Sequence, residues 1–410
     1  MDILLSRALG LLGLAILVAL AARRLRLPYT VGLVFAGAAL ALFRVEAGLA
    51  LTQDLIFDVV LPPLLFEAAL NLNWNELKRD LALVVALSTA GVALCAAVVA
   101  FGLVQWVGWR PEPALVFGAM IAATDPIAVI ALLHEAGVKG RLRLIIEAES
   151  LFNDGAAAVL FTLVLAWIAH DPASASGWRE AASGAMIVAG GLAIGLLVGL
   201  AAVLIAGTSD DHLVETALTA VAAFGSFLVA QYAGVSGVLA TVTAGIVMGN
   251  LGVLGKRGSL GLALTARGRA FVLEFWRFAA FLANSLVFLL IGSAMAKIDF
   301  AREGWRTLLL AVLLALAGRA AAVYPVCLLF SRTRWAAPLS DQHLLWWGGL
   351  RGALALALAL STPADLPQRE DILITAFAVV AFSVVVQGLT APFALKLRDL
   401  ALKKSPDTRP

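Results

Sequence analysis

Residues 149–158 read ESLFNDGAAA, and the apolar run VLFTLVLAWIA follows them directly. Two carboxylates, an amide and a hydroxyl therefore lie within a stretch long enough to cross a membrane. A charged side chain at the centre of a bilayer costs at least ~2.5–3.5 kcal/mol on insertion scales, so such residues usually pair or face a cavity. The stretch predicts a membrane-spanning helix that carries polar chemistry at its middle.

The composition of the whole chain agrees with this interpretation. Of its 410 residues, 62% are hydrophobic and 14% are charged, whereas about 25% charge is usual in soluble proteins. Most of the apolar residues form runs that approach the ~20 residues needed to cross a bilayer core. We expect an all-α polytopic membrane protein with a single integral membrane domain over residues 1–410 and a short cytoplasmic tail at 397–410.

The apolar runs predict about thirteen transmembrane helices. They cover residues 3–21, 29–43, 52–71, 81–107, 112–134, 143–169, 181–206, 213–233, 235–251, 269–295, 304–331, 341–361 and 370–396. If the N-terminus lies outside, 19 of the 30 Lys and Arg residues fall in inward segments and eight in outward ones. Because basic residues concentrate on the cytoplasmic side, we expect the N-terminus outside and the C-terminus in the cytoplasm.

The spacing within ESLFND predicts two polar stripes on one helix. Residues four apart differ by about 40° around a helix, so Glu149 lies above Asn153 and Ser150 lies above Asp154. The two stripes can therefore serve different partners. Gly155 and the alanines that follow allow a neighbouring helix to approach closely.

The preceding run contains AATDPIAV, which predicts a broken helix. Pro126 has no N–H and clashes with the carbonyl four residues back, so the helix must open near residues 122–126, with Thr124 and Asp125 at the break. Broken helices persist in membranes where their freed carbonyls line a protected cavity. Carbonyl, hydroxyl and carboxylate oxygens are ligands for a small hard cation.

A second interruption occurs in the twelfth run, where WWGGLRGALALALAL places Gly348, Gly349 and Gly352 around Arg351. Runs 1–6 and 8–13 would each contain an interrupted fifth member. Six spans plus one linker invert the second set relative to the first, which is typical of inverted-repeat transporters with a midplane site. Asp125 and Arg351 are candidates to offset the partial charges at the interrupted helix ends.

Four motifs together resemble the monovalent cation/proton antiporters. They are LPPLLFEAALN, AATDPIAV, ESLFNDG and GGLRGALALALAL, in the same order and spacing over nearly the whole chain. Among these proteins the chain is most similar to the NhaP-type bacterial sodium/proton antiporters. The resemblance implies the antiporter fold of thirteen helices, with a dimer-forming domain and a mobile core domain.

The resemblance also implies an ion site. Asp154 would carry either the cation or protons, and Thr124 and Asp125 would lie beside the ion. Ser150 and Glu67 match residues that help to ligate the cation. The implied Na⁺ ligands are thus Asp154, Thr124, Ser150 and Glu67.

Three further residues would support this site. Glu149 matches a glutamate that pairs with an arginine of the eleventh helix, and Arg319 is that arginine here. Asn153 takes the place held by a second aspartate in electrogenic relatives. With one titrating group left, we expect electroneutral exchange of one Na⁺ or Li⁺ for one H⁺, through competition for Asp154.

The same interpretation sets the expected partners. We expect no cofactor besides the transported ions, no enzymatic activity and no nucleic acid. The expected partners are membrane lipid and a second copy of the chain. The expected location is the cell membrane, which in a bacterium is the inner membrane. Three alternatives remain open: K⁺/H⁺ exchange on the same fold, a cation channel, and an intramembrane aspartyl protease built on Asp125 and Asp154.

Overall fold

The computed structural model describes residues 2–25, 27–44, 50–125, 130, 133, 140–169, 177–253 and 264–404. Regular structure in these ranges is helical, apart from one isolated bridge between Asp125 and Leu350. The first half contains α1 (Asp2–Leu25), α2 (Tyr29–Leu42), η1 (Leu55–Val60), α3 (Leu61–Asn71), α4 (Trp74–Ala86), η2 (Leu87–Gly91), α5 (Val92–Gly102), η3 (Leu103–Val107), α6 (Pro111–Ile121), α8 (Arg141–Ala169) and α9 (Gly177–Ala206). The second half contains α10 (His212–Tyr232), α11 (Gly237–Val247), η5 (Met248–Val253), α12 (Ala266–Met295), α13 (Trp305–Leu329), α14 (Leu339–Trp347), α15 (Ala353–Leu360), α16 (Arg369–Phe382), η6 (Ser383–Gln387) and α17 (Gly388–Lys404). The η segments are π-helical turns within longer helices.

Every predicted apolar run contains helix in the described part of the chain, and the fifth and twelfth runs are interrupted, which confirms the all-α polytopic fold. Several helices begin earlier than their apolar runs. The fourth starts at Trp74, where the Asn73 side chain accepts a hydrogen bond from the Asn75 N–H and caps the helix. Its first turns are polar, and a search for apolar residues does not register polar helical turns.

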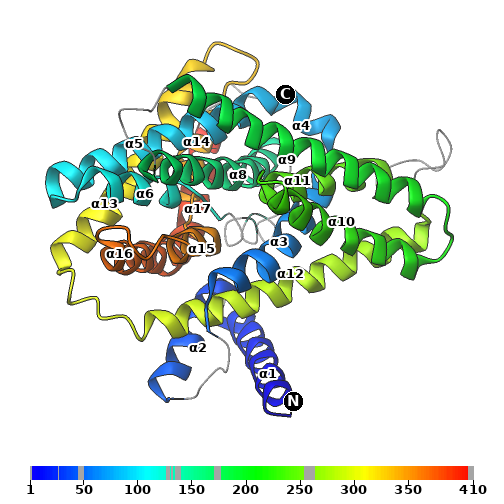
Figure 1. Cartoon of the computed structure of the whole chain (residues 1–410), viewed down its shortest axis with the longest axis horizontal. Coiled ribbons are helices and arrows are strands. Elements are labelled where there is room, and N and C mark those ends of the chain that lie inside the picture. Colours follow the sequence, from blue (N-terminus) through cyan, green and yellow to red (C-terminus); the bar gives the residue numbers. More distant parts are fainter. Residues whose placement is uncertain are drawn as a thin grey trace.

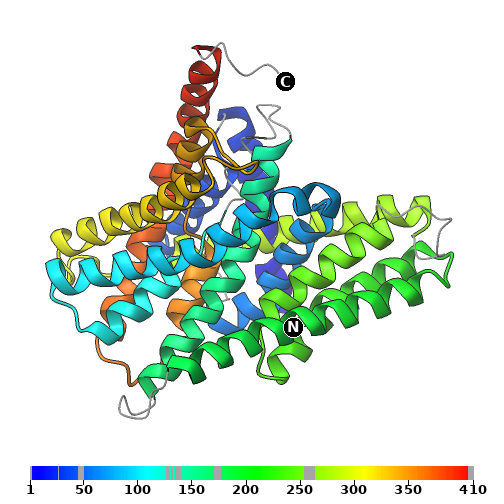
Figure 2. The same cartoon turned by 90° about the horizontal axis from the view of Figure 1, so that it is seen from above.

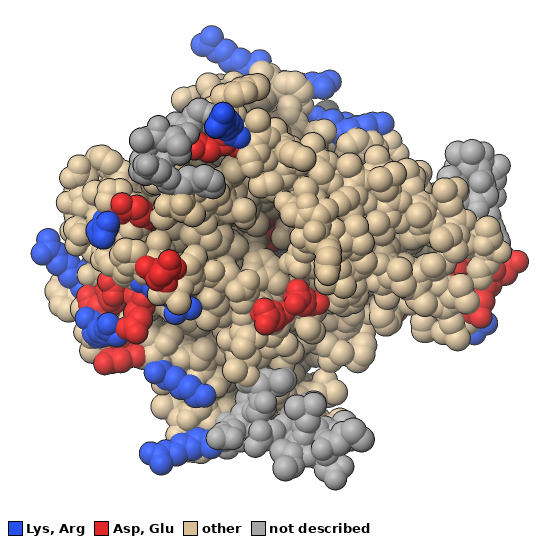
Figure 3. All heavy atoms as spheres, in the orientation of Figure 1, with Lys and Arg blue, Asp and Glu red and all other residues tan. Residues whose placement is uncertain are grey.

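The helices have the dimensions and surface of membrane spans. Seven described helices are long and apolar enough to cross a bilayer, and four shorter apolar helices accompany them. Large apolar side chains lie exposed along them, among them Leu17, Phe35, Phe101, Leu197, Leu228 and Leu329. Much of the face shown in Figure 3 carries no charged side chain, and a hollow near its middle shows an acidic group inside. A surface of this kind fits contact with lipid.

The helices pack in two groups that alternate along the sequence (Figures 1 and 2). One group contains α1–α3 and α9–α12, and the other contains α4–α6 and α13–α17. Helix α8 lies between the groups, since it packs on α4 and α6 as well as on α3, α9 and α11. The polar stretch ESLFND therefore lies where the two groups meet.

Glycines permit the closest helix contact within the first group. A Cβ on Gly37 of α2 would lie 1.9 Å from the Leu289 carbonyl oxygen of α12, and a Cβ on Gly292 would lie 2.0 Å from the Val34 carbonyl oxygen. The two backbones thus touch at two matching points. Without a hydrophobic driving force between helices in lipid, such close packing is a main source of association.

Polar contacts gather the predicted cytoplasmic segments at one end of the molecule. Arg141, at the start of α8, forms an ion pair with Asp80 of α4 at 2.8 Å and donates to the Trp335 and Ala336 carbonyls. Arg398 of α17 donates to Asp341 at 2.7 Å. Helix α17 continues to Lys404, so part of the predicted tail is helical.

The opposite end carries its own polar cluster, around the connection between α12 and α13. Arg302 of this connection forms an ion pair with Glu370 of α16, and Glu303 forms a hydrogen bond with Asp371. Partial burial, together with the hydrogen bond and the charge of Asp371, raises the pKa of Glu303 from an ordinary 4.5 to about 7, and Arg302 opposes this shift.

This pKa gives a testable pH dependence of stability. The folded state favours the protonated form of Glu303. The stability that this protonated side chain adds to the folded protein is therefore fully present below about pH 4.5 and is lost as the pH rises to about 7. Glu303→Gln should donate to Asp371 at every pH and should reduce the fall in melting temperature between pH 5 and pH 8. Thermal unfolding in detergent measures this, with Glu112→Gln in the partly exposed Arg110–Glu112 pair as control. An equal fall in the two variants would contradict the assignment.

Candidate functional site

Two unwound segments cross at the centre of the second group of helices. Helix α6 ends at Ile121, and residues 122–125 continue without regular structure. Gly348–Gly352 separate α14 from α15. The Asp125 N–H donates to the Leu350 carbonyl at 2.7 Å and joins the two segments. Pro126, on which the predicted break depends, lies outside the described residues.

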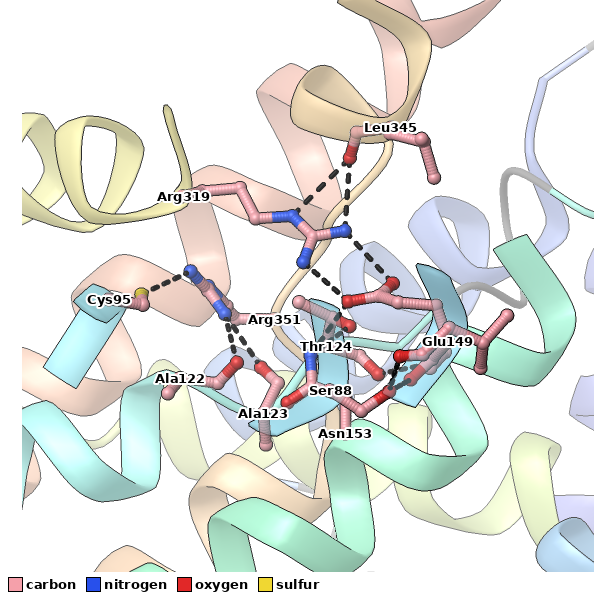
Figure 4. Close-up of polar contacts among 12 residues, drawn as sticks. Ser88, Cys95, Ala122, Ala123, Thr124, Glu149, Asn153, Arg319, Leu345 and Arg351 are labelled. Atoms are coloured by element: carbon pink, nitrogen blue, oxygen red, sulfur yellow. Dashed lines mark hydrogen bonds and ion pairs between the residues drawn. The ribbon is translucent and has the colours of Figure 1, made fainter. Parts of the chain in front are cut away.

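Arg351 lies at the C-terminal end of α6. Its guanidinium donates to the Ala122 and Ala123 carbonyls at 2.8 and 2.9 Å, and it also contacts the Cys95 sulfur at 3.6 Å (Figure 4). Carbonyls at a helix end lack partners within the helix and carry partial negative charge. Arg351 is only 2% exposed, so it satisfies these carbonyls out of contact with water.

Asp125 lies at the reciprocal position, against the start of α15. Gly352 is the N-cap of that helix, and a Cβ built on it would lie 2.2 Å from an Asp125 carboxylate oxygen. Only glycine allows this approach. A carboxylate beside a helix N-terminus is stabilised by the helix dipole, so each unwound segment supplies the charge that offsets a helix end of the other.

Glu149 of α8 and Arg319 of α13 form a buried ion pair with two hydrogen bonds, of 2.7 and 3.0 Å. Glu149 is 2% exposed and Arg319 is 5% exposed. Arg319 also donates to the Leu345 carbonyl in the last turn of α14 (Figure 4). A Cβ on Gly349 would lie 2.4 Å from the Arg319 Nε, so this glycine makes room for the guanidinium.

Asn153 connects this ion pair to the unwound segment of α6. Its Nδ2 donates to the Thr124 hydroxyl at 2.9 Å and to Glu149 at 3.3 Å. The Ser88 hydroxyl of η2 donates to the Glu149 carbonyl at 3.1 Å. The Glu149–Asn153 stripe of α8 thus faces the packed interior of the second helix group.

The other stripe of α8 faces a cavity of about 680 Å³. Asp154, Ser150 and Thr124 line it together with Asp125, and Glu67 of α3 lies on the opposite wall. The Ser150 hydroxyl donates to the Thr124 carbonyl, so the lone pairs of its oxygen remain available to a cation. The structure therefore brings all five predicted ion-site residues to one cavity between the two helix groups.

Asp154 differs from Glu149 in its partners. It is partly buried, and no described residue forms a hydrogen bond or ion pair with it. The carboxylates of Asp125 and Glu149 lie within electrostatic range. Glu67, in contrast, accepts a hydrogen bond from Asn71 at 2.9 Å. Asp154 is thus a carboxylate in a cavity with like charges near it, which is an arrangement that favours a bound cation or proton.

A second cavity, of about 600 Å³, approaches from the other end of α8. On α8 the second cavity reaches Ala158 and the first reaches Asp154. On α15 the second reaches Leu358 and the first Ala355. The second also reaches Asp58 on η1, and the first reaches Leu61 at the start of α3, which continues η1. Four residues of helix span about 6 Å. A thin, mostly apolar layer therefore separates the two cavities, and Asp154 lies on the side of the first.

Two charged residues of the first cavity, Arg143 and Glu147, were not among the predicted site residues. A signal for both was present, because Glu147 precedes Asp154 by seven residues and Arg143 precedes it by eleven. Both spacings return to nearly the same face of a helix. Ser88 was not predicted either, and its sequence context carries no such signal.

Comparison with known proteins places these features in a family. The family model described as "Sodium/hydrogen exchanger, transmembrane" matches residues 11–397. The low-affinity Na⁺/H⁺ antiporter NhaS1 of Synechocystis sp. is 37% identical over 92% of this chain and 70% of its own length. The Na⁺/H⁺ antiporter NhaH of Halobacillus aidingensis is 34% identical over 95% of this chain and 97% of its own length. The sodium proton antiporter MjNhaP1 of Methanocaldococcus jannaschii has the same fold, with a TM-score of 0.79, 20% identity, and coverage of 98% of this chain and 100% of that one.

Proposed function

Because the chain belongs to the sodium/hydrogen exchanger family, a family of transporters and not enzymes, we propose that it exchanges Na⁺ or Li⁺ for H⁺ through competition for Asp154. The observation that carries this proposal is the contrast between two carboxylates of one helix. Glu149 is held by Arg319, whereas Asp154 lines a cavity without an ion pair or hydrogen bond to any described residue.

The oxygen atoms around Asp154 suit a small hard cation. The Ser150 hydroxyl presents its lone pairs, and the Thr124 hydroxyl and the Asp125 carboxylate line the same cavity. Hard cations prefer carboxylate, hydroxyl and carbonyl oxygens. Glu67 accepts from Asn71 and lies on the other helix group, further along the same cavity, so it would bind the cation on its path to Asp154.

Competition at one carboxylate couples the two flows. Burial disfavours a bare carboxylate, whereas a proton or a cation neutralises it. The loaded site can therefore pass the apolar layer between the cavities with either ion, and the empty site carries an unpaired charge that resists the passage. Obligatory exchange follows from that difference, without a separate proton relay.

The proposal extends to assembly and orientation. The group α4–α6 and α13–α17, together with α8, would move as the core, while α1–α3 and α9–α12 would form the dimer-forming part. The first cavity opens at the end of α8 where the segments rich in Lys and Arg gather, which supports a cytoplasmic opening. We place the protein in the cell membrane as a homodimer, with its N-terminus outside and its C-terminus inside.

Electroneutrality provides the test of the exchange mechanism. Asn153 cannot take up a proton and Glu149 is held in an ion pair with Arg319, so one Na⁺ should move against one H⁺. Sodium-driven proton flux in proteoliposomes should be the same with the membrane potential clamped at zero by potassium and valinomycin as with the potential free. Slower flux without the clamp, or a potential generated by sodium alone, would contradict the one-site account. Parallel Li⁺ and K⁺ gradients determine the cation preference.

A further inference from the structure

The first cavity contains one basic side chain among its described lining residues. Four carboxylates, of Glu67, Asp125, Glu147 and Asp154, line it together with Arg143. A positive charge in such a cavity opposes the entry of a cation. The position of the Arg143 guanidinium therefore affects how strongly the cavity attracts Na⁺.

Arg143 is held along its own helix. Its Nε donates to the Glu147 carboxylate at 2.6 Å, one turn further along α8, and the two side chains are 33% and 13% exposed. The other guanidinium donors bond to no described residue. One short contact thus keeps this long side chain parallel to α8.

A competing partner for Arg143 lies across the cavity. Glu67 of α3 interacts electrostatically with Glu147, with Arg277 of α12 and, more weakly, with Arg143. Because α3 and α8 run in opposite directions along this cavity, Glu67 lies at about the level of Glu147, and Asp154 lies about 10 Å further along α8. Glu67 lines the same cavity as Arg143 and interacts with it across that cavity, so it is the partner to which a guanidinium released from Glu147 would turn.

We propose that Glu147 is a positioning residue for cation entry, which holds Arg143 on α8 and prevents it from neutralising Glu67. The proposal rests on the exchange function proposed above. An arginine that turned from α8 to α3 would remove a cation ligand and place a positive charge across the path to Asp154. It would also join the two helix groups that must move relative to one another.

The test is a double-mutant cycle on the KM for Na⁺, measured as the sodium-dependent collapse of an imposed pH gradient in proteoliposomes. Glu147→Gln should raise KM about three- to ten-fold, as expected for one charge at this range, with a smaller change in kcat. Arg143→Gln should lower KM. In the Arg143→Gln background, Glu147→Gln should have little effect, because no guanidinium remains to be released.

The controls separate this positioning role from a general effect of charge on the cavity. Glu112→Gln removes a carboxylate from an ion pair outside the cavity and should leave KM unchanged. Additive effects of the two cavity substitutions would show a long-range charge effect alone and would overturn the positioning role. If Glu147→Gln does not fold, the KM for Na⁺ of Arg143→Gln is the test, and a KM that is unchanged or raised in that variant overturns the proposal. Absence of exchange in the wild-type protein would instead refute the proposed function itself.

Discussion

Asp154→Asn should abolish sodium-driven proton flux while the protein still folds. Asparagine has the shape of aspartate but cannot take up a proton or supply the negative charge that a cation needs. Since Asp154 forms no hydrogen bond or ion pair with a described residue, the substitution breaks no contact in the described structure. Removing an uncompensated charge should leave the melting temperature equal or higher.

Two measurements on purified protein check this prediction. Flux in proteoliposomes should fall to the level of empty vesicles. Na⁺ should raise the melting temperature of the wild-type protein, because a ligand that binds the folded state stabilises it, but it should not raise that of the variant. Asp365→Asn makes the same chemical change at an exposed turn and should keep both properties. Exchange at the wild-type rate in Asp154→Asn would show that another group carries the ions.

Glu149 and Arg319 should give the largest effect on stability. Replacing either residue with leucine strands the other as a buried charge, which should lower the free energy of unfolding by ~3–5 kcal/mol. The double replacement should recover much of this loss, because neither charge remains. Recovery should be incomplete, since the Leu345 carbonyl loses the hydrogen bonds that it accepts from Arg319.

Unfolding in detergent, followed by a double-mutant cycle, measures this coupling. The control is the Glu274–Arg277 pair of α12, which lies at 2.8 Å but has side chains that are 71% and 60% exposed. Its removal should cost at most about 1 kcal/mol. If the double variant of Glu149 and Arg319 is no more stable than the less stable of the two single variants, the two charges do not compensate each other.

The sequence by itself determined the architecture, because the physics of the bilayer acts on local composition. A backbone in lipid must satisfy its own hydrogen bonds, so each long apolar run becomes a helix. The breaks could be located for the same local reason, from the proline after Asp125 and from the glycines around Arg351. The face of α8 that carries Asp154 followed from helical periodicity alone.

Other features depended on the tertiary structure, because they join residues that are distant in the sequence. Periodicity placed Glu149 and Asp154 on different stripes, but only the packing of α13 and α14 showed that Glu149 is held by Arg319, while Asp154 faces the cavity. The resemblance had suggested these roles without the geometry.

The clearest case is the pair Arg143 and Glu147. In the sequence they are two ordinary charges at the polar start of a helix, where solvated side chains are common. Their surroundings follow from α3 on the opposite wall, which is distant from α8 in the sequence and reaches them only through the packing of two helix groups. Local sequence determines which side chains a helix presents on each face, but the fold alone decides what lies opposite them.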